Sequence, residues 1–355
     1  MAWIGLRDAQ TGWFRPNREN LLPRGGVLRR GSLVMEVRLS DAARPQSLLA
    51  ISRSGIVQGR FSLEAMPRAG IVLVDARGAD IRHATLPFVS EGRFDTLRLT
   101  YNWDCAAGWS RLSLERPETD HVQSVTSKNP LPLPSEALEA LMLSQSDAVL
   151  GQNVIFVALS DRPQPVGPMP GLTAQVGIET AKGRRPVCQI RRGDSIYTSA
   201  GELVPVLRVV KRTVPARGGF RPIRLRAPFF GLATDAVLAP HERLVMTGGH
   251  VEYLFGRETV LVPAAHLVNA RSAFLAQGGD LVTYYHLLLA EHDAVLSGEC
   301  ALESLYIGRL RRKQDALAAS VLAALDRSRL PEHAKPISTV LKPFEAVALA
   351  LSRAA

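Results

Sequence analysis

The sequence of 355 residues has no long apolar run and no recognisable N-terminal signal. No stretch approaches the roughly 18 to 20 consecutive apolar residues that a transmembrane helix needs. The first 20 residues show no basic segment followed by an apolar one, which is the pattern of a secretory signal peptide. These absences predict no transmembrane segment. They favour a cytoplasmic location by default, with export by a route that needs no N-terminal signal left open.

Cysteine is also scarce, because the chain has only Cys105, Cys188 and Cys300, which lie far apart. An odd number of cysteines without paired spacing encodes neither a disulfide framework nor a zinc site. The sequence therefore predicts three reduced thiols, no metal site and no cofactor.

Aromatic residues make up only 6% of the chain, and its net charge is +10. Twelve basic side chains fall within residues 182–226, against two acidic ones, Asp194 and Glu202. Such a stripe can attract phosphate groups. Tyr197 and Phe220 are the only aromatic residues of that stretch, so base stacking has little to work with. We therefore disfavour nucleic-acid binding and interpret the charges as solvated strand faces.

The first half of the sequence alternates between apolar and polar residues with the period of two that is typical of half-buried strands. Residues 32–40, 59–65 and 92–104 show this alternation, and residues 70–76 form a continuous apolar run that favours a central strand. Short strands separated by Gly, Pro and Asp turns predict a β-sandwich over residues 1–160.

Proline and glycine punctuation separates this half from the rest of the chain. Residues 161–171 contain four prolines and two glycines, which exclude regular structure and predict a linker over residues 161–170. A second β-rich region follows, with turns expected at Gly183, Gly193 and Gly201.

Helical periodicity is limited to short segments. Residues 135–145 predict one helix after a Pro-Ser start, and another is expected after Pro343. Between them, residues 313–328 are rich in Ala and Leu and predict a helix in the tail. Its apolar stripe comprises Leu317, Val321, Leu322 and Leu325. We expect the tail helices to pack on the protein rather than bind a membrane, because their apolar faces are narrow and Ala-rich.

An ordered set of short motifs runs through residues 171–308. The opening motifs comprise Ile178, Thr180, Gly183, Pro186-Val187, Gly193-Asp194 and Thr198. The later motifs are "APHERLVM" at 239–246, "YLFG" at 253–256, "VLVPAAHLVN" at 260–269, "YYHLLLAEHDAVLSGE" at 284–299 and "ESLYIG" at 303–308. Their order and spacing resemble the Hint module, the autoprocessing fold shared by hedgehog C-terminal domains and inteins, in the variety common in bacterial Hint-domain proteins.

The resemblance implies self-cleavage, in which a Cys, Ser or Thr side chain attacks the preceding carbonyl and a histidine assists the leaving amine. The family spacing puts the nucleophile at Gly171, which has no side chain. The family sequence Ser-Pro-x-His-Arg aligns with residues 239–243 and puts Glu242 where the histidine is expected. His241 comes one residue early, and a shift of one residue along a strand turns a side chain to the opposite face. Both reactive groups are therefore missing from the family positions.

Four further residues are weaker candidates for function. His286 and His292 lie in the late motifs, where packing or a hydrogen bond is favoured over catalysis. Trp103 and Trp109 lie in and just after a strand pattern similar to the concanavalin-like jelly rolls that bind sugars. Either indole is a candidate ligand contact, although filling of the core is at least as well supported.

The sequence as a whole predicts a mainly β protein. We expect a jelly-roll-like β-sandwich over 1–160, a Pro-rich linker over 161–170, a Hint-type all-β domain over 171–308 and a helical tail over 309–355. The favoured function is that of a degenerate Hint protein with a binding or structural role and an unknown protein or glycan partner. The alternatives are an active self-cleaving Hint domain and a carbohydrate- or surface-binding module in the sandwich.

Overall fold

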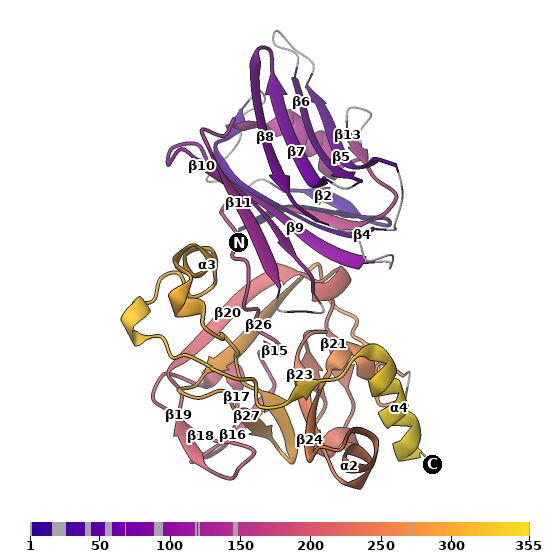
Figure 1. Cartoon of the computed structure of the whole chain (residues 1–355), viewed down its shortest axis with the longest axis vertical. Helices are drawn as coiled ribbons and strands as arrows, with labels where there is room; N and C mark the ends of the chain where they lie inside the picture. The colour runs from indigo at the N-terminus through magenta and orange to yellow at the C-terminus, as the bar shows by residue number, and fades with distance from the viewer. Residues whose placement is uncertain are drawn as a thin grey trace. The chain divides into compact units, whose positions relative to one another are not determined.

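The computed structural model divides the chain into two compact units, Met1–Val166 and Gly167–Ala355 (Figure 1). The fold is mainly β, as the sequence predicts. The structure describes residues 2–15, 26–39, 44–53, 59–67, 69–88, 95–117, 119, 121–144, 148–269 and 271–354.

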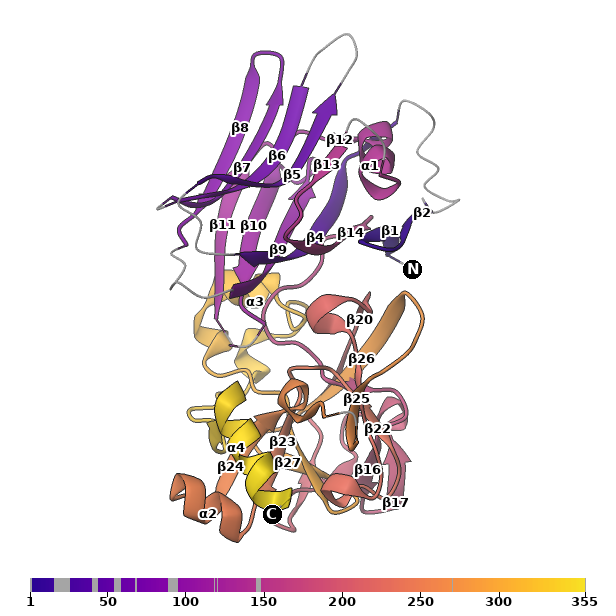
Figure 2. The same cartoon turned by 90° about the vertical axis from the view of Figure 1, so that its right-hand side faces the viewer.

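Unit 1 is a sandwich of two antiparallel sheets, which Figure 2 shows face to face. Its elements are β1 Trp3–Asp8, β2 Gly12–Phe14, β3 Val27–Leu28, β4 Arg30–Leu39, β5 Gln46–Arg53, β6 Gly59–Met66, β7 Gly70–Arg77, β8 Asp80–Leu86, β9 Asp95–Asp104, β10 Trp109–Glu115, β11 Val122–Lys128, β12 Leu133–Pro134, α1 Ser135–Met142, β13 Ala148–Leu150 and β14 Val154–Ser160. One sheet has the order β11-β10-β9-β4-β14-β1-β2, and the other has the order β13-β5-β6-β7-β8.

The predicted alternation explains the core of unit 1. Strands β4 and β9 pair so that Met35 lies opposite Leu99 and Val37 opposite Leu97. These side chains share one face of the sheet because successive residues of a strand point to opposite sides. All four are buried in the same apolar cluster, to which the second sheet contributes side chains such as Phe61. The strands predicted over 59–65 and 70–76 are thereby confirmed, and those predicted over 32–40 and 92–104 are confirmed for residues 32–39 and 95–104. Residues 40 and 92–94 lie outside the described residues.

Unit 2 contains three sheets. Its elements are β15 Leu172–Thr173, β16 Gly177–Thr180, β17 Gly183–Pro186, β18 Ser195–Tyr197, β19 Leu203–Pro205, β20 Arg208–Pro215, β21 Ile223–Leu225, β22 Ala236–Leu238, β23 Arg243–Thr247, α2 Gly249–Phe255, β24 Thr259–Pro263, β25 Ala273–Leu275, β26 Leu281–Leu288, β27 Ala294–Ser297, β28 Cys300–Glu303, α3 Gln314–Ala319, β29 Thr339–Val340 and α4 Pro343–Ala354. The sheet orders are β20-β26-β15-β22-β21-β25, β17-β16-β18-β19 and β27-β28-β23-β24-β29. The predicted turn glycines at 183, 193 and 201 have φ values of 88°, 88° and 79°, a region that favours glycine.

The tail differs from the predicted helical stripe in one respect. Helix α3 ends before Ser320, whose hydroxyl donates to the Leu317 carbonyl at 2.8 Å and accepts from the Leu322 amide at 3.1 Å. A serine that bonds to the nearby backbone in this way offers an alternative to further helical turns. The apolar stripe still packs in a small cluster. The tail also supplies β29, which pairs in parallel with β24.

Candidate functional site

Residue 171 immediately precedes β15, which lies between β26 and β22 in its sheet. Leu172 of β15 pairs with Tyr285 on one side and with Leu238 on the other. Gly171, one residue before Leu172, therefore lies beside His286 of β26 and beside the turn that follows β22. This topology brings the start of the Hint-like region, the late-motif histidine and the turn at 239–242 together.

Gly171 and Glu242 face each other in this site. A Cβ atom added to Gly171 would lie 1.9 Å from Glu242 Oε2, so the carboxyl group fills the space that a side chain at 171 would need. The backbone of Gly171 is fully engaged, because its amide donates to His286 Nδ1 at 3.0 Å and its carbonyl accepts from the Ala239 amide at 2.7 Å. The sequence predicted that positions 171 and 242 belong to one site, and the geometry agrees with this.

The Glu242 carboxyl is almost completely buried, with 1% exposure. Loss of solvation raises its pKa well above the usual value of 4.5, and the carboxylate of Glu303 adds to this. Burial therefore favours the protonated, uncharged form of the Glu242 carboxyl. Burial raises the pKa of the nearby Cys300 thiol to about 12, so this thiol is not a ready nucleophile.

His286 is held as a neutral imidazole with a fixed tautomer. Its Nδ1 accepts the Gly171 amide proton, and its Nε2 lies 2.9 Å from the Glu303 carbonyl, to which it must donate. Burial lowers the pKa of this histidine to about 4. Nδ1 also lies 3.5 Å from Glu242 Oε2, and burial shifts the pKa values of both groups towards their uncharged forms.

His241 lies in a different place from the one that the strand argument suggested. Residues 239–242 form a turn between β22 and β23, closed by the Glu242 amide and the Ala239 carbonyl at 3.0 Å. The expected strand at this point is wrong, because the chain must reverse before β23 begins. His241 Nε2 lies 3.0 Å from the carbonyl oxygen of Met169. It therefore contacts the segment that leads into residue 171.

His292 belongs to a neighbouring cluster around Glu303. Its Nε2 lies 3.2 Å from Glu303 Oε1, and its Nδ1 accepts the Ile337 amide at 3.2 Å. Arg243 Nη1 lies 3.3 to 3.4 Å from both carboxylate oxygens of Glu303. Sequence reasoning found Glu303 in the "ESLYIG" motif but gave it no role. In the structure its side chain joins Arg243 to His292, while its carbonyl orients His286.

The two tryptophan candidates lie in unit 1 and have different surroundings. Trp103 is fully buried, and its Nε1 donates to the Leu28 carbonyl at 3.0 Å. It therefore packs in the core, and a sugar has no access to its ring. Trp109 is half-buried, with the guanidinium of Arg111 5.5 Å from the ring centroid.

Two general features of the described residues bear on the kind of site. Within the ranges given above, no three His, Cys, Asp or Glu side chains are grouped so that they could hold a metal ion. No helix in those ranges is long and apolar enough to span a membrane.

Comparison with known proteins identifies the second unit. Residues 170–309 match the family model of the Hint domain, and this chain therefore carries a Hint domain. No curated protein matches the sequence.

The chain is also similar to solved structures, at low TM-scores. The AceL NrdHF class 3 split intein is 10% identical, with 39% of this chain and 100% of the intein covered and a TM-score of 0.28. The sialidase module CBM40 of Ruminococcus gnavus is 13% identical, with 38% of this chain and 77% of that chain covered and a TM-score of 0.28.

Proposed function

We propose that this chain is a Hint protein that has lost self-cleavage and persists at full length in a binding or structural role. The observation that carries this is the occupied space at position 171. Glycine supplies no nucleophile there, and the Glu242 carboxyl takes the volume in which one would have to stand. Acyl transfer to a side chain needs a nucleophile beside the scissile carbonyl, and none is provided at this position.

The surrounding groups support the same conclusion. Departure of the residue-171 amine would need a proton donor at its nitrogen, but His286 Nδ1 is an acceptor there. The imidazole proton is on Nε2 and is engaged by the Glu303 carbonyl. Thr173 is two residues away, and its hydroxyl donates to the Val237 carbonyl at 2.8 Å.

The same groups hold the unbroken chain in place. His241 contacts the Met169 carbonyl, His286 accepts the Gly171 amide, and the Ala239 amide donates to the Gly171 carbonyl. Three hydrogen bonds, one to Met169 and two to Gly171, fix the entry of the chain into β15. We therefore assign to this site the task of clamping residues 169–171.

Intact-mass measurement tests the loss of cleavage. The purified chain, incubated with dithiothreitol or hydroxylamine, is expected to give one species of 38.6 kDa. Fragments of 170 and 185 residues, which correspond to a break before Gly171, would show that cleavage survives. A Cys300→Ser variant serves as the control, because abolition of such cleavage by this change would identify the unusual nucleophile.

A second candidate function is saccharide binding by unit 1, and it is favoured by the half-exposed Trp109 beside Arg111. An indole ring next to a cation can stack on a sugar and bond to its oxygen atoms. A glycan array with the full chain is expected to show ligands that Trp109→Ala abolishes. A Trp13→Ala variant is the matched control, because Arg15 covers that ring at 5.3 Å in a similar way. Absence of any ligand would remove this function.

A further inference from the structure

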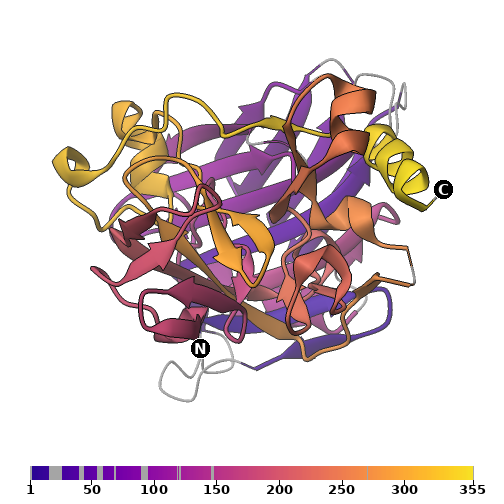
Figure 3. The same cartoon turned by 90° about the horizontal axis from the view of Figure 1, so that it is seen from below.

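Helices α2 and α4 lie side by side in unit 2 (Figures 1 and 3). His250 of α2 is joined to Ser352 of α4 by a hydrogen bond of 2.8 Å. The inner face of α4 packs on the domain core through Ala346 and Leu349. The two helices therefore form one continuous surface with a common inner support.

The outer face of this pair is apolar as well. The α2/α4 patch comprises five large side chains that are between 37% and 87% exposed, namely Tyr253, Leu254, Phe344, Val347 and Leu351. A helix that is apolar on both faces is typical of a helix covered on both sides. Exposed apolar side chains that stand singly are normal on a protein surface, whereas five of them on two adjoining helices are typical of an interaction site.

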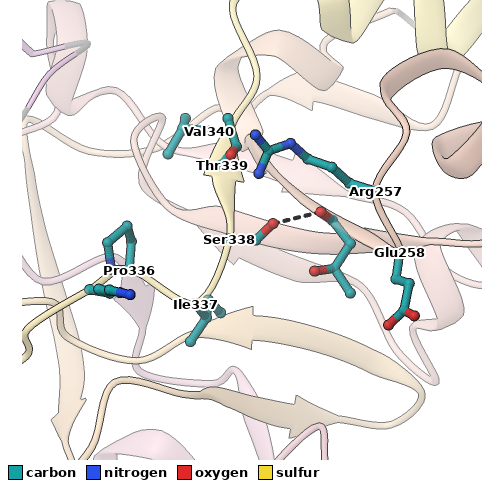
Figure 4. A pocket seen from close by; sticks show the side chains of 9 residues that line it. Arg257, Glu258, Pro336, Ile337, Ser338, Thr339 and Val340 are labelled. Atoms are coloured by element: carbon teal, nitrogen blue, oxygen red, sulfur yellow. Dashed lines mark hydrogen bonds between the residues drawn. The ribbon is translucent and has the colours of Figure 1, made fainter.

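The rim of the patch carries charges of both signs. Glu252, Glu258 and Glu345 lie close in sequence to Arg257, Lys335 and Lys342. A groove of about 770 Å³, lined by residues 257–259 and 335–340, adjoins the chain ends of α2 and α4 (Figure 4). In that view the Arg257 side chain extends over Thr339 and Val340, and the Ser338 hydroxyl bonds to the Thr259 carbonyl.

We infer that a second copy of this chain covers the α2/α4 patch. A two-fold dimer applies the same surface to itself, so with charges of both signs beside the patch its acids can pair with the partner's bases. A lipid surface is a poorer match, because interfacial helices gain affinity from a strongly basic polar face.

The mass of the full-length chain in solution tests this dimer. Sedimentation velocity from nanomolar to high-micromolar protein is expected to show a monomer–dimer equilibrium. Phe344→Asp and Tyr253→Asp are each expected to raise the dissociation constant by at least about 30-fold, the usual effect of losing one central side chain of an interface. Tyr253 is the most exposed of the five side chains, so its replacement leaves the fold intact.

Leu275→Asp is the matched control, because Leu275 is 49% exposed in β25 and outside the patch. It is expected to leave the dissociation constant unchanged. A chain that stays monomeric over the whole range would overturn the dimer, as would a dimer that both patch variants leave intact. Binding of the monomer to vesicles of anionic lipid, lost in Phe344→Asp, would show that a membrane covers the patch instead. Intact mass is unaffected in all these cases, so this test is independent of the loss of cleavage.

Discussion

Glu242 places a carboxyl group where the family pattern has an imidazole. Burial of this carboxyl favours its uncharged form. An unfolded glutamate titrates near 4.5, whereas the folded carboxyl titrates well above that value. Between the two values the folded state binds more protons, so the free energy of unfolding falls as the pH rises. His286 acts in the opposite direction. Its stabilising contribution is present above 6.5 and is lost as the pH falls towards about 4.

A Glu242→Gln substitution separates these two effects, because it keeps the shape of the side chain and removes its titration. We expect the variant to gain stability over the original chain as the pH rises above 4.5, by about 1.4 kcal/mol for each pH unit up to the raised pKa of the folded carboxyl. Urea denaturation followed by circular dichroism at a series of pH values measures the difference. The exposed Glu258→Gln is the control, and a constant offset for Glu242→Gln would contradict the burial of its proton.

Restoring both missing groups tests the identity of the site. Gly171→Cys alone adds a thiol that meets the Glu242 carboxyl, and it leaves position 242 without an imidazole. Glu242→His alone has no nucleophile. Because groups that act as a unit are strongly non-additive, we expect cleavage before residue 171 in the double variant only. Gel analysis with and without dithiothreitol measures the yield, which we expect to be partial because Pro170 precedes the bond.

Two results would count against Glu242 as the replacement of the family histidine. One is cleavage by Gly171→Cys without the second change. The other is cleavage of the double variant that disappears when His241→Ala is added, since that result would give the role of the histidine to His241, which is bonded to Met169.

At the scale of elements, the strands could be predicted from the sequence, whereas one turn, one helix end and one contact could not. Alternation and turn glycines gave the strands, because side-chain direction in a strand depends on sequence parity alone. The turn at 239–242 and the early end of α3 at Ser320 were missed, since both depend on local hydrogen bonds that apolar periodicity does not encode. The contact of His286 with Gly171 was missed as well, because it arises from strand pairing between residues 115 positions apart.

The segment after β14 is a further case in which hydrogen bonds decide. Gln164 lies in the predicted linker, yet its amide donates to Ser32 Oγ at 2.7 Å and to Asn102 Oδ1 at 2.9 Å. Asn102 Nδ2 in turn donates to the Gln164 carbonyl at 3.0 Å. The chain is therefore attached to the sandwich as far as residue 164, within the range predicted as a linker.

Asn102→Ala removes this attachment and leaves the Gln164 carbonyl without the donor from residue 102. We expect it to destabilise unit 1 by about 1 to 3 kcal/mol, the usual cost of a buried polar group deprived of its partner. Asn153→Ala is the control, because its bond to Gln46 at 2.9 Å is exposed and is expected to matter little. The midpoint of tryptophan emission in urea measures both variants. Equal midpoints would show that Gln164 is not held by Asn102.

At the scale of the whole molecule, each unit has an apolar core of its own. One cluster extends from Ile4 to Leu159 and another from Leu172 to Leu349. Tryptophan side chains, which serve as fluorescent probes, are unevenly distributed between the two units. All four tryptophans, Trp3, Trp13, Trp103 and Trp109, lie in unit 1. Tryptophan emission therefore reports the unfolding of unit 1, while circular dichroism reports both units.

Two separate cores predict two separate unfolding transitions, since cooperativity is a property of a domain that shares one core. In urea we expect the emission curve to follow one of the two steps seen by circular dichroism. Asn102→Ala is expected to shift only the emission step. Glu242→Gln, at pH values above 4.5, is expected to shift only the other step. Each variant should change the stability of the other unit by no more than about 0.5 kcal/mol. Coincident curves for the original chain, with each variant shifting both probes together, would mean that the Hint domain and the sandwich unfold as one body.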